Sequence, residues 1–115
     1  MKNDKSIREL AMELTIQMVN ICDKIKGREI FTNQLLRAVS SIGANMSEAK
    51  YAQSDQDFVH KAEIALKECY ESEYWLEILT RIGALTEEEQ KEVKNACGTI
   101  RSKLIASIKT VKTHK

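Results

Sequence analysis

The sequence predicts an all-α fold: an antiparallel, up-down-up-down four-helix bundle that assembles as an oligomer. The 115 residues include no proline and only four glycines, so little in the chain interrupts helices. Apolar residues recur at alternating steps of three and four along four segments, which places them on one side of each helix. Only short breaks separate the segments, and short connections make successive helices antiparallel. We expect a single domain over residues 1–115.

The first helix is expected over about residues 4–26. Asn3 or Asp4 can cap its start. Gly27 can adopt the left-handed conformation that commonly ends helices. Its apolar seam consists of Ile7, Ala11, Leu14, Met18, Ile21 and Ile25.

The second helix is expected over about residues 32–52. Thr32 is a plausible N-cap, although Ile30 and Phe31 would allow the helix to begin earlier. Gly43 lies in mid-helix, where glycine costs about 1 kcal/mol relative to alanine, so it indicates a close helix crossing. The seam consists of Leu35, Val39, Ile42, Met46 and Ala49.

The third helix is expected over about residues 55–82. Ser54 and Asp57 resemble a capping box at its start, and Gly83 ends it. Beside its seam the helix carries a second stripe that includes apolar residues, and such a helix usually faces more than one neighbour. The seam consists of Phe58, Ala62, Ala65, Cys69, Ser72, Leu76 and Leu79, and the candidate oligomer interface of Tyr70, Tyr74, Trp75 and Ile78.

The fourth helix is expected over about residues 87–112. Thr86 and Glu89 have the spacing of a capping box. The seam consists of Val93, Cys97, Ile100, Leu104, Ile108 and Val111.

Charge is distributed unevenly along a chain whose net charge is only +1. Ten acidic and four basic residues lie between positions 57 and 92, whereas six basic residues and no acid follow. The split has two interpretations: complementary faces within or between bundles, or a basic C-terminal strip that contacts nucleic acid. The candidate nucleic-acid-binding residues are Lys94, Arg101, Lys103, Lys109 and Lys112.

The sequence does not predict catalysis, a metal site or a cofactor. A di-iron bundle requires a Glu-x-x-His pair on each of two helices, and only Asp57 and His60 approach that spacing. Cys22, Cys69 and Cys97 occupy apolar helical positions, as core thiols do. No glycine-rich phosphate loop or Cys-x-x-Cys pair occurs. We expect a protein that is not an enzyme.

No apolar run approaches the roughly 18 residues of a membrane span, and the N-terminal segment lacks the features of a signal peptide. We therefore expect a cytoplasmic protein without membrane contact.

A polar stripe follows the second helix beside its seam. Its residues could meet acidic residues of the third helix and form buried, charge-assisted hydrogen bonds that fix the register of the two helices. The alternative is a polar pocket for a ligand or partner chain. The stripe consists of Arg37, Ser41, Asn45 and Glu48, and the facing acids are Glu68 and Glu71.

Two segments carry a family resemblance. Positions 34–49 read QLLRAVSSIGANMSEA, and positions 54–76 read SDQDFVHKAEIALKECYESEYWL. Together they resemble the bacterial four-helix-bundle family named for proteins encoded in intervening sequences of large-subunit rRNA genes, whose members are often labelled ribosomal proteins. The family is similar to the accessory proteins of diversity-generating retroelements, whose pentamers bind nucleic acid and the reverse transcriptase.

The resemblance implies a left-handed bundle that assembles as a ring, commonly a homopentamer. It also implies that a set of matching polar residues serves bundle and subunit cohesion, namely Arg37, Ser41, Asn45, Glu48, Lys67, Glu68 and Glu71. The resemblance favours an RNA- or DNA-associated accessory protein. The retroelement proteins tend to be strongly basic, whereas this chain has a pI near 7.7, which favours the alternative of a protein-interaction scaffold that makes no nucleic-acid contact.

Overall fold

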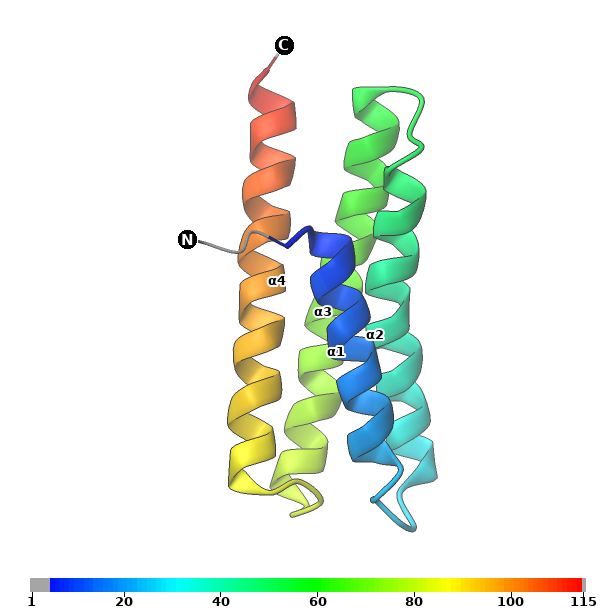
Figure 1. Ribbon diagram of the computed structural model, residues 1–115, viewed down its shortest axis with the longest axis vertical. Coiled ribbons are helices and arrows are strands. Elements are labelled where there is room, and N and C mark those ends of the chain that lie inside the picture. Colours follow the sequence, from blue (N-terminus) through cyan, green and yellow to red (C-terminus); the bar gives the residue numbers. More distant parts are fainter. Residues whose placement is uncertain (1–4, 115) are drawn as a thin grey trace.

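The computed structural model describes residues 5–114, which form four α-helices and, within that range, no strand (Figure 1). The helices are α1 (Ile7–Cys22), α2 (Glu29–Ala49), α3 (Asp55–Arg81) and α4 (Glu87–Thr113). Successive helices run in opposite directions along the long axis (Figure 1).

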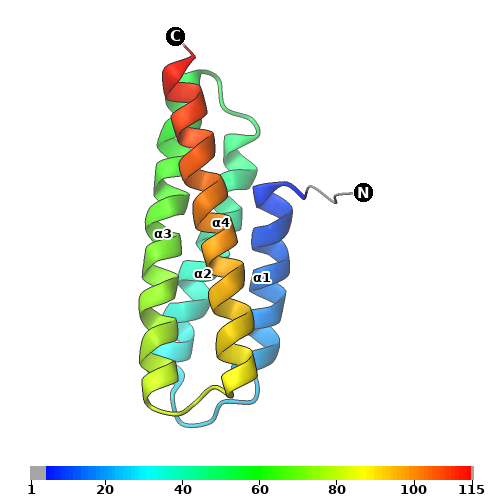
Figure 2. The ribbon, with the colours of Figure 1, turned by 90° about the vertical axis from the view of Figure 1, so that its left-hand side faces the viewer.

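Each helix contacts the helices before and after it in the chain, and α4 closes the bundle against α1. Among the described residues, no Cα atom of α1 lies within 8 Å of one in α3, and none of α2 lies within 8 Å of one in α4. Because α1 has 16 residues and α4 has 27, α1 covers only part of the length of α4 (Figure 2). The edge formed by α1 and α2 therefore lies opposite the edge formed by α3 and α4.

The four predicted seams meet in one core. Every seam residue is buried except Ile7, Ile25, Phe58 and Val111, which are partly buried. The buried side chains of α3 from Ala62 to Ser72 are all small, whereas those of α2 and α4 include valine, leucine and isoleucine. The largest fully buried side chains include Leu14, Met18, Leu35, Ile42, Leu79, Ile100 and Leu104.

Helix α1 is shorter than predicted. Ser6 caps its start by accepting a hydrogen bond from the Glu9 backbone N–H at 3.0 Å, and the predicted caps Asn3 and Asp4 lie outside the described residues. The helix ends at Cys22 rather than near residue 26, because two tight turns follow it and leave Ile25 packed against the core. Gly27 has the predicted positive φ of 74°, but it lies in the connection beyond the helix end.

Helix α2 begins at Glu29, so Thr32 is not its N-cap, and the alternative of an earlier start through Ile30 and Phe31 is confirmed. Arg28 occupies the cap position and makes no side-chain capping bond. Thr32 is instead a buried residue whose hydroxyl donates to the Glu29 carbonyl at 3.4 Å. The earlier start brings Phe31 into the helix, where its ring centroid lies 6.3 Å from that of Trp75 on α3. Packing thus decides the helix start here.

Gly43 marks the close approach of α1 and α2 that the sequence predicted. A Cβ atom at this position would lie 3.4 Å from the Ala11 Cβ and 4.0 Å from the Met12 backbone nitrogen. The space admits a methyl group and nothing larger.

The helix-start signals of α3 and α4 are present. Ser54 accepts from the Asp57 N–H at 3.0 Å, although the Asp57 carboxylate returns to the Gln53 N–H and not to that of Ser54. Thr86 and Glu89 form a complete capping box with two 3.0 Å hydrogen bonds. Helix α2 ends three residues before the predicted position 52, at Ala49, whereas α3 and α4 end within one residue of their predicted ends at 82 and 112.

Candidate nucleic-acid interface

Two of the five candidate cations on α4 are ion-paired within the bundle. The Arg101 guanidinium donates to both carboxylate oxygens of Glu73 on α3, at 3.1 to 3.3 Å. Lys112 Nζ lies 3.0 Å from a carboxylate oxygen of Glu63, also on α3. These pairs join the acidic segment to the basic one, as the first interpretation of the charge split predicts.

The other three candidates have no carboxylate within ion-pair distance among residues 5–114. Lys94 lines a cleft between α3 and α4 together with Glu73 and Leu76. Lys109 lines an apolar groove farther along the same two helices. Lys103 lies nine residues from Lys94, about two and a half helical turns, and is therefore on the opposite side of α4. The predicted strip is thus divided between two sides of the helix.

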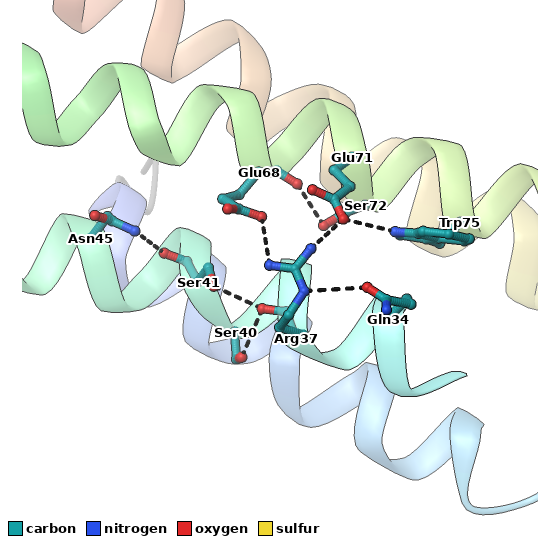
Figure 3. A network of polar contacts seen from close by, with 9 residues as sticks. All are labelled: Gln34, Arg37, Ser40, Ser41, Asn45, Glu68, Glu71, Ser72 and Trp75. Carbon is teal, nitrogen blue, oxygen red and sulfur yellow. Dashed lines mark hydrogen bonds and ion pairs between the residues drawn. The ribbon is translucent and has the colours of Figure 1, made fainter. Parts of the chain in front are cut away.

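Arg37, at the N-terminal end of the predicted polar stripe, joins α2 to α3 (Figure 3). Its guanidinium pairs with Glu68 at 3.4 Å and with Glu71, and the Glu71 carboxylate also accepts from the indole N–H of Trp75 at 3.0 Å. The hydrogen bonds that the Glu71 carboxylate accepts from Trp75, the larger effect, and from Arg37 lower the pKa of Glu71. The side chains of Arg37, Glu68 and Glu71 are 48%, 20% and 37% exposed, so the expectation of buried bonds was wrong.

The rest of the stripe makes local contacts. Ser41 donates to the Arg37 carbonyl at 2.8 Å, and Asn45 donates to the Ser41 carbonyl at 2.8 Å, so neither reaches α3 by a hydrogen bond (Figure 3). Glu48 does reach α3, where it pairs with Lys61 at 2.7 Å and raises the pKa of that lysine. Lys67 is exposed and has no ion-pair partner in the described range.

Aromatic and aliphatic side chains lie on the surface shared by α2 and α3. Tyr74 and Trp75 pack edge to face with centroids 5.1 Å apart, and Trp75 and Ile78 are partly buried. Tyr70 and Tyr74 are exposed. Ile30 and Ile82, which the sequence analysis did not assign to an interface, are exposed nearby at the ends of the same two helices.

A second apolar surface was missed by the sequence analysis. Met12, Ile16 and Val19 point outward from α1, on the side away from its buried seam, and all are exposed. Their spacing of four and three residues was the available signal, because it repeats the helical period a second time along one helix.

All three cysteines are free thiols that lie buried in the core. Burial raises the pKa of the Cys22 thiol to about 11. The Cys69 thiol donates to the Cys97 carbonyl at 3.5 Å, and both side chains are fully buried. His60 is exposed, and no group of three potential metal ligands occurs within the described part of the chain. None of the helices described is long and apolar enough to cross a membrane.

Residues 3–106 match the model of the 23S rRNA-intervening sequence protein family. A solved structure from Bacteroides thetaiotaomicron, a protein of unknown function from the S23 ribosomal protein family, shares 37% sequence identity with the chain and superimposes with a TM-score of 0.85. The match covers 90% of this chain and 99% of that one. No curated protein matches the chain. A family match over most of the chain, together with this structural likeness, shows that the chain belongs to the 23S rRNA-intervening sequence protein family.

Proposed function

We propose that this protein is a non-enzymatic, cytoplasmic helical bundle that assembles into a homo-oligomeric ring and contacts nucleic acid. The observation that carries the proposal is the presence of two separate exposed apolar faces on the bundle. One face is formed on α1 by Met12, Ile16 and Val19, and the other on α2 and α3 by Ile30, Tyr74 and Ile82.

Two different faces on one chain suit a head-to-tail contact, in which the α1 face of one copy covers the α2/α3 face of the next. Head-to-tail contacts close into rings when the rotation between copies permits. Tryptophan, tyrosine and arginine dominate binding energy at protein interfaces, and Trp75, Tyr74 and Arg37 lie together on the α2/α3 face. We propose a left-handed bundle and a pentameric ring, in keeping with the family resemblance.

The nucleic-acid contact is assigned to Lys94, Lys103 and Lys109 of α4. These lysines have no carboxylate within ion-pair distance among residues 5–114, whereas Arg101 and Lys112 are paired with acids of α3. A ring repeats these lysines in every copy, and repeated weak sites bind far more tightly than one. The family description connects its members with rRNA genes, which agrees with an RNA- or DNA-associated role.

Fluorescence anisotropy with labelled structured RNA and duplex DNA, at several salt concentrations, tests this assignment. Replacing Lys94, Lys103 and Lys109 by glutamine should reduce the slope of log affinity against log salt on duplex DNA by up to about 2.7, since each neutralised phosphate contributes about 0.9.

The matched control removes the paired acids instead. Glu63→Gln with Glu73→Gln frees the cations of Lys112 and Arg101, so binding should tighten. Wild-type protein that binds neither ligand at low salt would refute the nucleic-acid role.

The second candidate is a protein-interaction scaffold without nucleic-acid contact. The groove between α3 and α4 favours it, because Leu66, Ile105 and Ile108 give it an apolar floor. A protein partner such as a reverse transcriptase would then bind to the surface of α3 and α4, where the ion pairs between the two helices balance positive with negative charge. Partner capture unaffected by the α4 lysine variant would support this candidate.

A further inference from the structure

Helix α2 ends beside the start of α1 (Figure 2), and two pairs of interacting side chains lie on these two segments. Arg8 on α1 donates from Nε to the Ser47 hydroxyl on α2 at 2.8 Å. Lys50 follows Ser47 on the same side of the helix, and its Nζ lies 5.8 Å from the centre of the Tyr51 ring. These four residues, Arg8, Ser47, Lys50 and Tyr51, form the α1/α2 corner.

Packing within the chain does not explain the position of Tyr51. Its side chain is 76% exposed, the largest value among the exposed large hydrophobic residues of the described range. A ring so exposed contributes little to the core. One face is approached by the Lys50 ammonium, an arrangement in which cation and ring attract each other.

The two cations of the corner have no ion-pair partner in the described part of the chain. Neither Arg8 nor Lys50 lies within ion-pair distance of a carboxylate in residues 5–114. The acids on neighbouring turns are engaged elsewhere: Glu48 pairs with Lys61 at 2.7 Å, and Asp57 accepts from the Gln53 N–H at 3.2 Å.

Asp55, in the first turn of α3, and Glu9, next to Arg8 on α1, are carboxylates for which the structure records no side-chain bond within the described range. Arg8 and Lys50 are nevertheless not paired with either of them, in contrast to the paired Arg101 and Lys112 of α4.

The chemistry of these groups matches one phosphate and one base. Within residues 5–114 the Arg8 side chain makes one hydrogen bond, from Nε, so its two terminal nitrogens can donate to a phosphate, and Lys50 adds a second positive charge. The free face of Tyr51 offers a platform on which an unpaired base can stack. Bases within a duplex are already stacked, so this combination favours single strands and ends.

We propose that the α1/α2 corner binds single-stranded nucleic acid, with Arg8 and Lys50 on the phosphate and Tyr51 stacked on a base. This inference rests on the proposed nucleic-acid role and adds a second contact, on the opposite edge of the bundle from α3 and α4. A strand held there while α4 holds a duplex segment would give the protein a preference for junctions between the two.

Anisotropy with a labelled oligo-uridine of about twelve nucleotides tests the site, a length within the range that single-strand sites cover. Tyr51→Leu should weaken binding by about five-fold to a hundred-fold, the range expected for losing one stacked base. Tyr51→Phe retains the ring and should bind as the wild type does. Because Tyr51 is exposed, both variants should keep the wild-type melting temperature.

The contribution of the positive charges of Arg8 and Lys50 is measured by the salt dependence of binding. Arg8→Gln and Lys50→Gln together should reduce the slope of log affinity against log salt by about 0.7, the value for one single-strand phosphate. Asp55→Asn should strengthen binding, because it removes a carboxylate for which no side-chain bond is recorded in the described range. The control is Lys26→Gln, an exposed lysine without an ion pair in the described range at the far end of the bundle, and it should leave the slope unchanged.

The possible failures are distinguishable. Oligo-uridine binding that survives Tyr51→Leu and falls only with the α4 lysine variant would overturn the α1/α2 corner and leave the proposed function standing. Wild-type protein that binds no nucleic acid at low salt would overturn both. Equal losses for Tyr51→Leu and Tyr51→Phe would also overturn stacking as the mode of binding.

Discussion

The ion-pair network of Arg37 gives a quantitative prediction about how α2 and α3 are held together. The perturbation is a double-mutant cycle of Arg37→Met, Glu71→Gln and the combined variant. Arg37 and Glu71 are each more than a third exposed, so the pair belongs to the surface class, whose coupling is about 0.2–1 kcal/mol. Because Trp75 also fixes the Glu71 carboxylate, we expect a value near the top of that range, about 1 kcal/mol.

Urea unfolding of the four proteins at one protein concentration measures this coupling. The matched control is the pair of Arg81 and Glu77, which lies on one helix at 2.6 Å with side chains 77% and 59% exposed. Its coupling should be about 0.3–0.5 kcal/mol. Coupling of 3 kcal/mol or more for Arg37 would indicate a fully buried pair. Coupling no larger than that of the control would show that Trp75 contributes no order; either result would refute the reasoning.

Three further predictions concern packing, helix crossing and pH. Leu104→Ala should cost about 2–5 kcal/mol in unfolding free energy, whereas exposed Ile105→Ala should cost less than about 1. Gly43→Ala should stabilise by up to about 1 kcal/mol, since its Cβ meets α1 at 3.4 Å, and Gly43→Leu should destabilise; thermal melts distinguish them. The hydrogen bond from the Thr86 backbone lowers the pKa of Glu89. The ionised Glu89 carboxylate therefore stabilises the folded protein fully at pH values above the ordinary glutamate pKa of 4.5, and this stabilisation is lost as the pH falls through the folded-state pKa. Glu89→Gln should reduce the change of melting temperature with pH across that acid range.

The core followed from the sequence because its signal is local. Steps of three and four recur through each segment, so the buried residues of α3 and α4 could be named without knowing their neighbours. The capping box of Thr86 and Glu89 is equally local and was found in full. Gly43 was informative because its cost in a helix required a compensating contact, which Ala11 supplies.

What the sequence did not predict depends on contacts between segments. Phe31 and Trp75 draw the start of α2 back to Glu29, and Thr32 alone gives no sign of that contact. The ion pairs of Arg101 and Lys112 depend on the register of α4 against α3, which charge counts along the chain do not contain.

The solvent exposure of the polar stripe also could not be predicted from the sequence. Arg37 lies in the predicted stripe, but only the packed helices show that its network remains open to solvent. The outward face of α1 was missed for a different reason. Its helical spacing is visible in the sequence, but only the apolar seam beside it was interpreted as an apolar surface.

The solution mass, measured by light scattering at micromolar concentration, tests the proposed head-to-tail assembly most directly. Wild type should exceed the 13.1 kDa of a single chain several-fold. Ile16→Glu on the α1 face and Tyr74→Glu on the α2/α3 face should each yield monomers. Mixed together, the two variants should form dimers and nothing larger, because each retains the face that the other has lost. A wild-type mass of 13.1 kDa, or variants that assemble as the wild type does, would contradict the proposal.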